Sequence, residues 1–295
     1  MSRKAEAARQ PQPALARAQR AAQRHALDAA LAEERETLQA LFPLESLQRP
    51  ARKPRRVAPV LGLLLAAAAA AAAWWADPAY RSEHLASAIG ARERYLLGDG
   101  SEITLDSDTV ADVSWHLRSR RVALLQGRAR FAVTPAVVRP FEVDAGLAQV
   151  RVVGTRFDVS RTDSEVQVQV LEGRVQLRGS AGQPWNAAPP LAPGQARRIR
   201  AGEAPGPVRQ VDIARAGAWA EGRLVFESTP LSEALAEVQR YRRGAIRLQG
   251  DKAGQLRLSG VFDTARPDDM LRALPHILPV ELRWAADGGA ELRAR

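Results

Sequence analysis

Residues 165–177 read EVQVQVLEGRVQL, in which valines alternate with polar residues until a Glu-Gly pair interrupts the pattern. Successive side chains of a β-strand point to opposite faces of the sheet, so this alternation is typical of a strand with one buried face. The glycine marks a turn, and the alternation resumes after it. The stretch therefore predicts two short strands joined by a tight turn.

The same signature recurs on the N-terminal side of this stretch, with a turn about every eight to twelve residues. The signals are Ile103 and Leu105 after the turn Gly98-Asp99-Gly100-Ser101, Val122–Leu125 before Gly127, and the alternating residues Ala129, Phe131 and Val133. Many short strands with regular turns are typical of an antiparallel sandwich. We therefore expect an all-β domain over residues 92–200.

Beyond a Gly/Pro-rich linker at 201–218, strand and helix signals alternate. Strands are predicted at 223–226, 245–248, 255–262, 280–284 and 290–293. One helix is predicted after Thr229-Pro230, with Thr229 as its cap, and another from Pro267. Two small β–α–β units predict an α+β domain over residues 219–295.

Residues 57–76 read VAPVLGLLLAAAAAAAAWWA and carry no charge. About twenty helical residues cross a hydrocarbon core of roughly 30 Å, so this stretch predicts a transmembrane helix. Arginine and lysine gather before it, and Trp74 and Trp75 stand at its far end. This arrangement predicts a cytoplasmic N-terminus and a periplasmic C-terminus in a bacterial inner membrane. A buried alanine-rich helix and a cleaved signal peptide are the alternatives. Residues 77–91 are interpreted as a linker.

Residues 1–56 are rich in helix-forming residues and too few to hold a core of their own. A helix over residues 20–42 places one narrow apolar stripe on its surface. The stripe consists of Leu27, Leu31, Leu38, Leu41 and Phe42. Such a helix either binds a partner or remains a solvated tail, and the segment alone leaves both readings open. Residues 44–56 form a basic linker.

The composition argues against several function classes. There are no cysteines and only four histidines, at wide spacing, so no metal site and no cofactor is expected. No phosphate-binding glycine loop or catalytic constellation is present either, which argues against an enzyme. The net charge of +10 comes from arginines scattered among acidic residues, which argues against direct nucleic-acid binding.

Several motifs follow one another in an order that resembles the FecR family of ferric-citrate-type sensors. They are Leu97-Gly98-Asp99-Gly100-Ser101, Leu125-Gln126-Gly127-Arg128-Ala129-Arg130-Phe131, Arg139-Pro140-Phe141-Glu142-Val143, Val153-Gly154-Thr155-Arg156-Phe157-Asp158-Val159, Val170-Leu171-Glu172-Gly173-Arg174-Val175 and Pro193-Gly194-Gln195. The C-terminal part resembles the short N-terminal domain shared by secretins and TonB-dependent receptors. Its matching residues are Leu224, Phe226, Pro230-Leu231 and Arg240-Tyr241.

This resemblance implies a transmembrane signal transducer. The cytoplasmic segment would bind an extracytoplasmic-function (ECF) sigma factor, and the C-terminal domain would receive a signal from the signalling domain of a TonB-dependent siderophore or haem receptor. The candidate receptor-contacting residues of that domain are Trp219, Phe226, Leu231, Leu235 and Tyr241. The protein would thus act as an anti-sigma factor or sigma regulator in the control of iron transport. A membrane-anchored envelope-binding module with no role in transcription is the alternative.

The resemblance also draws attention to the Gly154-Thr155 step, where some relatives are split by an N–O acyl shift. In that reaction the threonine hydroxyl attacks the preceding carbonyl, and the resulting ester is hydrolysed. A β-bulge between two strands is the alternative interpretation of the same residues. Apart from this step, no catalytic residue is expected.

Overall fold

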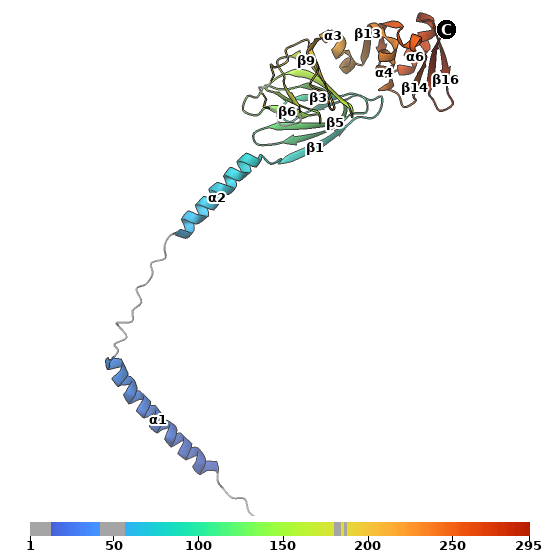
Figure 1. The fold of residues 1–295 in the computed structure, drawn as a ribbon. Helices are drawn as coiled ribbons and strands as arrows, with labels where there is room; N and C mark the ends of the chain where they lie inside the picture. Colours follow the sequence, from blue (N-terminus) through green and yellow to red (C-terminus); the bar gives the residue numbers. More distant parts are fainter. Residues whose placement is uncertain (1–12, 42–56, 180–183, 186–187) are drawn as a thin grey trace, which may run out of the picture. The chain divides into compact units, whose positions relative to one another are not determined.

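The computed structural model describes residues 13–41, 57–179, 184–185 and 188–295. The chain divides into two compact units, Met1–Ala68 and Ala69–Arg295. Helix α1 (Pro13–Leu41) belongs to the first unit. Two β-rich domains make up nearly all of the second (Figure 1).

The predicted fold class contained one membrane-spanning helix, and that part of the prediction is wrong. A helix does cover Val57–Ala76 (α2), but no helix within the described part of the chain is long and apolar enough to cross a membrane. The side chains described in α2 run from Leu65 to Ala76 and are mostly alanine, which adds little apolar surface.

The first domain is a sandwich of two sheets that share strand β5 (Arg120–Ala132). One sheet contains the first half of β5 with β1 (Arg81–Ala86), β4 (Val110–Trp115), β6 (Phe141–Asp144), β7 (Ala148–Val152) and β10 (Gln176–Gly179). The other contains its second half with β2 (Glu93–Leu96), β3 (Glu102–Leu105), β8 (Arg156–Arg161), β9 (Glu165–Glu172), β11 (Gln195–Arg200) and β12 (Arg209–Gln210). Apart from the parallel pair β5–β6, neighbouring strands described in this domain are antiparallel.

Strand β5 passes from one sheet to the other at Gly127, where φ is +88°. A Cβ atom at this position would lie 2.2 Å from Oγ1 of Thr109 and 2.7 Å from its Cα. The bend therefore requires glycine both for its backbone conformation and for the close approach of the β3–β4 connection. Within the motif LQGRARF, Gly127 is therefore the residue at which the strand bends.

The alternating apolar residues face inward and form one continuous core between the two sheets. Phe131 stacks on Phe157 with ring centroids 5.1 Å apart, and Phe141 lies 5.9 Å from Phe131. The domain begins earlier than the sequence suggested, since β1 lies within residues 77–91, which were interpreted as a linker. Strand β1 escapes a periodicity search because most of its side chains are exposed.

The second domain contains two small sheets covered by helices. Its elements are α3 (Ile213–Gly217), the 3₁₀ helix η2 (Ala218–Glu221), β13 (Arg223–Pro230), α4 (Leu231–Gln239), β14 (Ile246–Gln249), α5 (Asp251–Gly254), β15 (Arg257–Asp263), α6 (Pro267–Ile277), β16 (Val280–Trp284) and β17 (Ala290–Ala294). Strand β13 pairs with β15, and the order of the other sheet is β14-β17-β16. Apolar residues of α4 and α6 bury against these strands and form a second, separate core.

Candidate functional site at the junction of the two domains

Three polar residues form a row across the outer face of the second sheet of the sandwich. Arg130 on β5 is the cross-strand neighbour of Asp158 on β8, and Asp158 is the neighbour of Gln169 on β9. The adjacent residues Ala129, Phe131 and Phe157 face the core, so strand alternation directs the polar row outward. From the sequence alone, polar residues that alternate with apolar residues along a strand are expected to face solvent.

The polar row is covered by the start of the second domain. Arg130 binds Asp158 through two hydrogen bonds, Nε to Oδ1 at 2.7 Å and one Nη to Oδ2 at 2.9 Å. The indole Nε1 of Trp219 donates to the same Oδ2 at 2.9 Å, and the amide of Gln169 donates to it at 3.0 Å. The Asp158 carboxylate is therefore buried yet fully partnered, as a buried charge must be.

Trp219 lies between two guanidinium groups of β5. The Cζ atoms of Arg128 and Arg130 are 4.7 Å and 5.3 Å from the indole ring centre. Only 3% of the Trp219 surface is exposed. Gly217 allows this approach, because a Cβ atom there would lie 3.0 Å from an Nη atom of Arg130. Trp219 is thus an anchor of the second domain, held by cation–π contacts and one charge-assisted hydrogen bond.

A second cluster lies beside the first and joins Arg128 to the end of α4. Arg128 donates from Nε to Oδ2 of Asp106 at 2.7 Å and from one Nη to the Tyr241 hydroxyl at 3.0 Å. The Tyr241 hydroxyl donates to Oδ1 of Asp106 at 2.9 Å. Glu237, which is partly exposed, approaches Arg128 at 3.3 Å. Arg128 therefore contacts the end of β3 in its own domain and, in the second domain, η2 through Trp219 and the end of α4 through Tyr241.

The electrostatics of this cluster favour the docked arrangement. Burial alone would lower the pKa of Arg128, but the nearby Glu237 and Asp106 raise it above its ordinary value. Burial raises the pKa of the Tyr241 hydroxyl, and Asp106 adds to the increase, so the tyrosine stays protonated and can donate its hydrogen bond. Burial would raise the pKa of Glu237, but Arg128 and Arg240 outweigh it and lower that pKa.

Two ion pairs of the junction lie within the first domain, whereas the pair of Arg128 with the partly exposed Glu237 joins the two domains. Asp106 follows β3 and is paired with Arg128 of β5. Asp158 lies on β8 and is paired with Arg130 of the same strand β5. Separation of the domains would therefore remove Trp219 and Tyr241 without leaving either carboxylate alone. Since an orphaned buried charge costs roughly 3–5 kcal/mol, the pairing of Asp106 and Asp158 within the sandwich makes the junction easier to open than one in which these carboxylates depended on the second domain.

The structure brings together two of the five residues predicted in the second domain and separates the others. Trp219 and Tyr241 lie at the junction, facing the first domain. Phe226, Leu231 and Leu235 are buried in the core of the second domain, where they hold its elements together. Asp106, Arg128, Arg130 and Asp158 were not singled out as site residues. Charged residues alternating with core residues on a strand, as in Arg128-Ala129-Arg130-Phe131, are the signal that could have indicated them.

The N-terminal helix was predicted to carry a partner-binding stripe. Leu27 and Leu31 lie one turn apart on α1 and are both exposed. The side chains of Leu38 and Leu41, and the whole of Phe42, lie outside the described residues. Partner binding by this stripe stays a prediction.

The Gly154-Thr155 step lies in the turn between β7 and β8. The Thr155 hydroxyl is buried and donates to the carbonyl of Arg174 at 3.1 Å. Gly173, with φ +81°, packs against this step, and a Cβ atom there would lie 3.0 Å from the Gly154 carbonyl oxygen. Gly154 itself lies close to Pro135, which leaves no room for a side chain. The step is a tightly packed turn, and both interpretations of it, a β-bulge and a self-cleavage site, stay untested.

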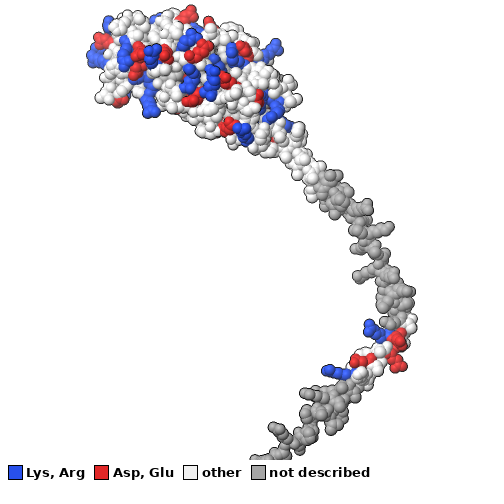
Figure 2. All heavy atoms as spheres, turned by 180° about the vertical axis from the view of Figure 1, so that it is seen from behind, with Lys and Arg blue, Asp and Glu red and all other residues white. Residues whose placement is uncertain are grey.

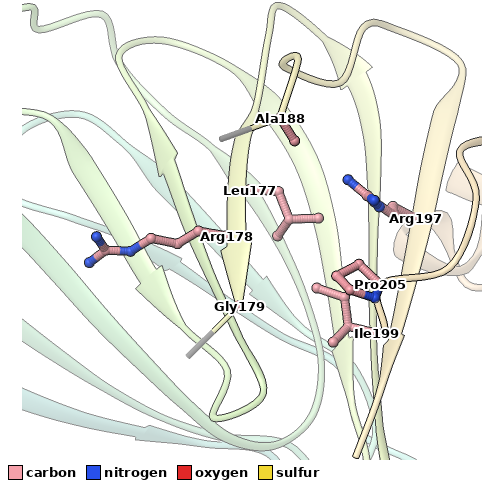
Figure 3. A pocket seen from close by; sticks show the side chains of 7 residues that line it. All are labelled: Leu177, Arg178, Gly179, Ala188, Arg197, Ile199 and Pro205. Carbon is pink, nitrogen blue, oxygen red and sulfur yellow. The ribbon is translucent and has the colours of Figure 1, made fainter. Parts of the chain in front are cut away.

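Other features of the described residues give little support to a ligand site. A hollow of about 180 Å³ lies between β10 and β11, with Leu177, Ile199 and Pro205 in its lining (Figure 3). Pockets for organic ligands usually have about 300–1,000 Å³. Among the described residues no group of three or more His, Cys, Asp or Glu side chains could hold a metal ion. In the view of Figure 2, side chains of both charges are interspersed over the folded domains.

The fold and its junction define a two-domain protein in which a β-sandwich carries a small α+β module on the outer face of one sheet. Residues 83–176 match the family model described as FecR protein. The resemblance found in the sequence is thereby confirmed for this part of the chain, which contains a FecR domain. No curated protein matches the chain.

Two crystal structures of a proposed anti-sigma factor from Parabacteroides distasonis ATCC 8503 share the fold. The structure at 2.50 Å resolution has 21% sequence identity and a TM-score of 0.61, and the match covers 73% of this chain and 100% of that one. For the structure at 1.65 Å the identity is 22%, the TM-score 0.61, and the coverage 72% and 99%. This similarity extends over far more of the chain than the FecR domain alone.

Proposed function

We propose that this protein regulates a sigma factor, and that its C-terminal domain receives the signal that controls the regulation. The FecR domain over residues 83–176 carries this proposal. The shared fold with a proposed anti-sigma factor supports it. The finer proposal is that the sigma factor is of the ECF class and that the signal comes from the signalling domain of a TonB-dependent receptor.

The proposal gives the junction a role in transmission. A partner that binds the second domain changes the free energy of its docking, and the β-sandwich responds because Trp219 and Tyr241 contact its strand β5 directly. A ligand shifts such an equilibrium only by the difference between its affinities for the docked and undocked forms. Because Asp106 and Asp158 stay paired within the sandwich, undocking leaves neither carboxylate alone. The free energy of undocking is therefore small enough for the binding of a partner to supply it.

Sigma binding is assigned to the apolar stripe of α1. Leu27 and Leu31 are exposed leucines on one helical face, which is the pattern used by helices that dock into apolar grooves. The double variant Leu27→Asp, Leu31→Asp should abolish co-purification of the full-length chain with its sigma factor. The control is Ala29→Asp, which places an acidic side chain on the opposite face of the helix. Equal recovery of the sigma factor with both variants would contradict the assignment.

Transcription from a sigma-dependent reporter tests the regulatory role as a whole. The wild-type gene and one lacking residues 213–295 should differ in their response to an inducing iron source. An unchanged response in both, and in a strain without the gene, would favour the envelope-binding module that has no role in transcription.

The proposal places residues 1–56 in the cytoplasm and the two β-rich domains in the periplasm of a bacterial cell. The partners require this division, because sigma factors act in the cytoplasm and TonB-dependent receptors present their signalling domains to the periplasm. Protease added to spheroplasts should digest the β-rich domains and spare the N-terminal segment. Protection of both parts would contradict this location.

A further inference from the structure

Strand β1 is an edge strand that the structure leaves open on one side. It pairs with β4 in an unbroken antiparallel register from Arg81 to Ala86, and no strand within the described residues pairs with its other edge (Figure 1). At its end, the Ala86 carbonyl accepts a hydrogen bond from the Tyr95 hydroxyl at 3.0 Å. The open part of the edge is therefore 81–85, whose backbone can pair with a further strand.

The other edges of the sandwich are less suited to such pairing. Strands β2 and β12 contain four and two residues, whereas β1 contains six. The chain beside β10 is occupied, because Leu191 forms a β-bridge with Val175, the residue before that strand. Strand β1 contains no proline, lysine or bulge, which are features that block pairing at an edge.

The charges of β1 are complementary to those of a second copy of the same strand. Arg81 and Glu83 share one face of the strand, and Ser82 lies between them on the other face. A single charge on the core face blocks pairing with an ordinary strand. When two β1 strands pair antiparallel about Ser82, however, Arg81 of each copy lies opposite Glu83 of the other. Opposite charges in this position stabilise the pairing of two strands.

The same register also suits the remaining residues of the strand. The Arg81 and Glu83 side chains are 62% and 32% exposed, so both are accessible to a second copy. Ser82 lies opposite itself, and the exposed Tyr80 of each copy lies opposite the exposed His84 of the other. If the centre moved by one residue, to Arg81 or Glu83, two like charges would lie directly opposite each other, which is unfavourable. The charge pattern therefore selects one register.

We propose that two copies of this chain associate through their β1 strands and form one continuous sheet. The contact is isologous, because each copy supplies the same strand and the same charges. A short and mostly polar strand gives a small interface, so the association is reversible and depends on the concentration of the chain. It is independent of the proposed sigma regulation.

The absence of cysteine from the sequence allows a direct test of the register in the full-length chain. Directly opposed residues of an antiparallel pair have Cα atoms about 4.5–5.5 Å apart, which a disulfide can bridge. Ser82→Cys should therefore form a disulfide-linked dimer under mild oxidation, seen on a non-reducing gel. Ser259→Cys, at an exposed serine of β15, measures cross-linking by chance collision and should give little dimer.

The position of the cysteine along β1 tests the register further. His84→Cys should not cross-link to itself, because the two residues would be about 13 Å apart along the paired strands. A mixture of His84→Cys and Tyr80→Cys should form the dimer, because these residues lie opposite each other. Equal self-cross-linking of His84→Cys and Ser82→Cys would overturn the register, and cross-linking of Ser82→Cys no faster than that of Ser259→Cys would overturn the proposal.

A charge exchange tests the ion pairs by sedimentation equilibrium of the full-length chain. Arg81→Glu or Glu83→Arg alone should weaken self-association about tenfold, because two favourable pairs become two unfavourable ones. The double variant Arg81→Glu, Glu83→Arg should restore the association, which a merely structural effect of either substitution would not do. A double variant as weak as the two single variants would overturn the role of the ion pairs.

Discussion

Trp219 is the residue on which the docking of the two domains depends most. It belongs to the second domain by sequence, yet its ring is buried against the sandwich and its Nε1 donates to a carboxylate of that domain. Tryptophan suits this position because it combines a large apolar surface with a single donor and a face that attracts cations.

Replacing Trp219 should loosen the junction in proportion to what each variant removes. Trp219→Phe keeps most of the ring but loses the hydrogen bond to Asp158, which should cost about 1.5–3 kcal/mol. Trp219→Ala should cost about 3–5 kcal/mol. Urea unfolding, together with proteolysis in the segment 201–212, measures both effects. Trp75→Ala is the control, since that ring is 79% exposed, and a loss of stability as large as that of Trp219→Ala would contradict the assignment.

The stability of the protein should depend on pH in a way that the junction explains. The pKa of Glu237 is lowered in the folded chain, so its contribution is present above the ordinary value of 4.5 and is lost as the pH falls below it. The pKa of Tyr241 is raised, so its contribution is present below the ordinary value of 10.0 and is lost as the pH rises above it. Unfolding free energy should therefore decline below about pH 4.5 and above about pH 10.

Single variants separate the two limbs of this profile. The lowered pKa values of Asp77 and Asp99 also contribute to the acid limb, so Glu237→Gln should make it shallower without removing it. Tyr241→Phe should make the alkaline limb shallower. Urea unfolding at a series of pH values measures both effects. Glu233→Gln, on an exposed face of the same helix, serves as the control. An acid limb equally steep in Glu237→Gln and in the wild type would contradict the assignment.

The Gly154-Thr155 step should remain intact. The Thr155 hydroxyl donates to a backbone carbonyl, and a carbonyl cannot take up its proton. Within the described part of the chain, no side-chain base is hydrogen-bonded to that hydroxyl. We expect the wild type and Thr155→Ala to run as one full-length band of equal mobility on a denaturing gel. Two fragments from the wild type and none from the variant would show that the N–O acyl shift occurs.

At the scale of the elements, β5 determines the architecture of the sandwich. Its first half pairs with β4 and β6, and its second half with β3 and β8. The bend at Gly127 divides these halves and brings the Asp106–Arg128 pair to the surface that the second domain covers. One glycine therefore controls both the joining of the sheets and the placing of the junction.

Gly127→Ala should destabilise the sandwich strongly. The new Cβ would meet the backbone of Thr109, which cannot move without disturbing the β3–β4 connection, and φ at this position is unfavourable for alanine. We expect a loss of at least about 2 kcal/mol by urea unfolding. Gly98→Ala is the matched control, since its Cβ would meet nothing within 4 Å. Similar losses in the two variants would contradict this account.

Element positions could be predicted from the sequence wherever one face of an element is buried. Strand β9 and strand β16 follow from their alternation, and α6 begins at Pro267 as expected, with two aspartates in its first turn. The predicted cap of α4 is wrong in detail, because Thr229 belongs to β13 and the Leu231 N–H instead bonds the carbonyl of Leu256. A tertiary contact took the place of the local cap.

For the molecule as a whole, the two β-rich domains could be predicted but their junction could not. Arg128 and Arg130 alternate with core residues, and periodicity alone cannot tell a face covered by another domain from a face covered by water. The partners Asp158 and Trp219 lie 61 positions apart in the chain. Only the fold brings them together, which is why sequence analysis named Trp219 and Tyr241 without their partners.

The sandwich should fold without the second domain. Residues 77–212 contain its whole core and both internal ion pairs, so removal of the second domain exposes partnered charges and no apolar core. A fragment of these residues should show β-sheet circular dichroism and a cooperative melting transition, at a lower Tm than the same fragment extended to residue 295. An unfolded fragment would show that the junction is needed for folding.

The buried carboxylates Asp106 and Asp158 are paired within the sandwich, so the sandwich does not depend on one particular second domain. Because the sandwich satisfies its acids internally, a gene rearrangement that removed the second domain, or exchanged it for another module bearing a suitable indole, would leave a viable protein. The junction therefore permits recombination, and this sandwich is suited to appear in combination with different sensory modules in different genomes.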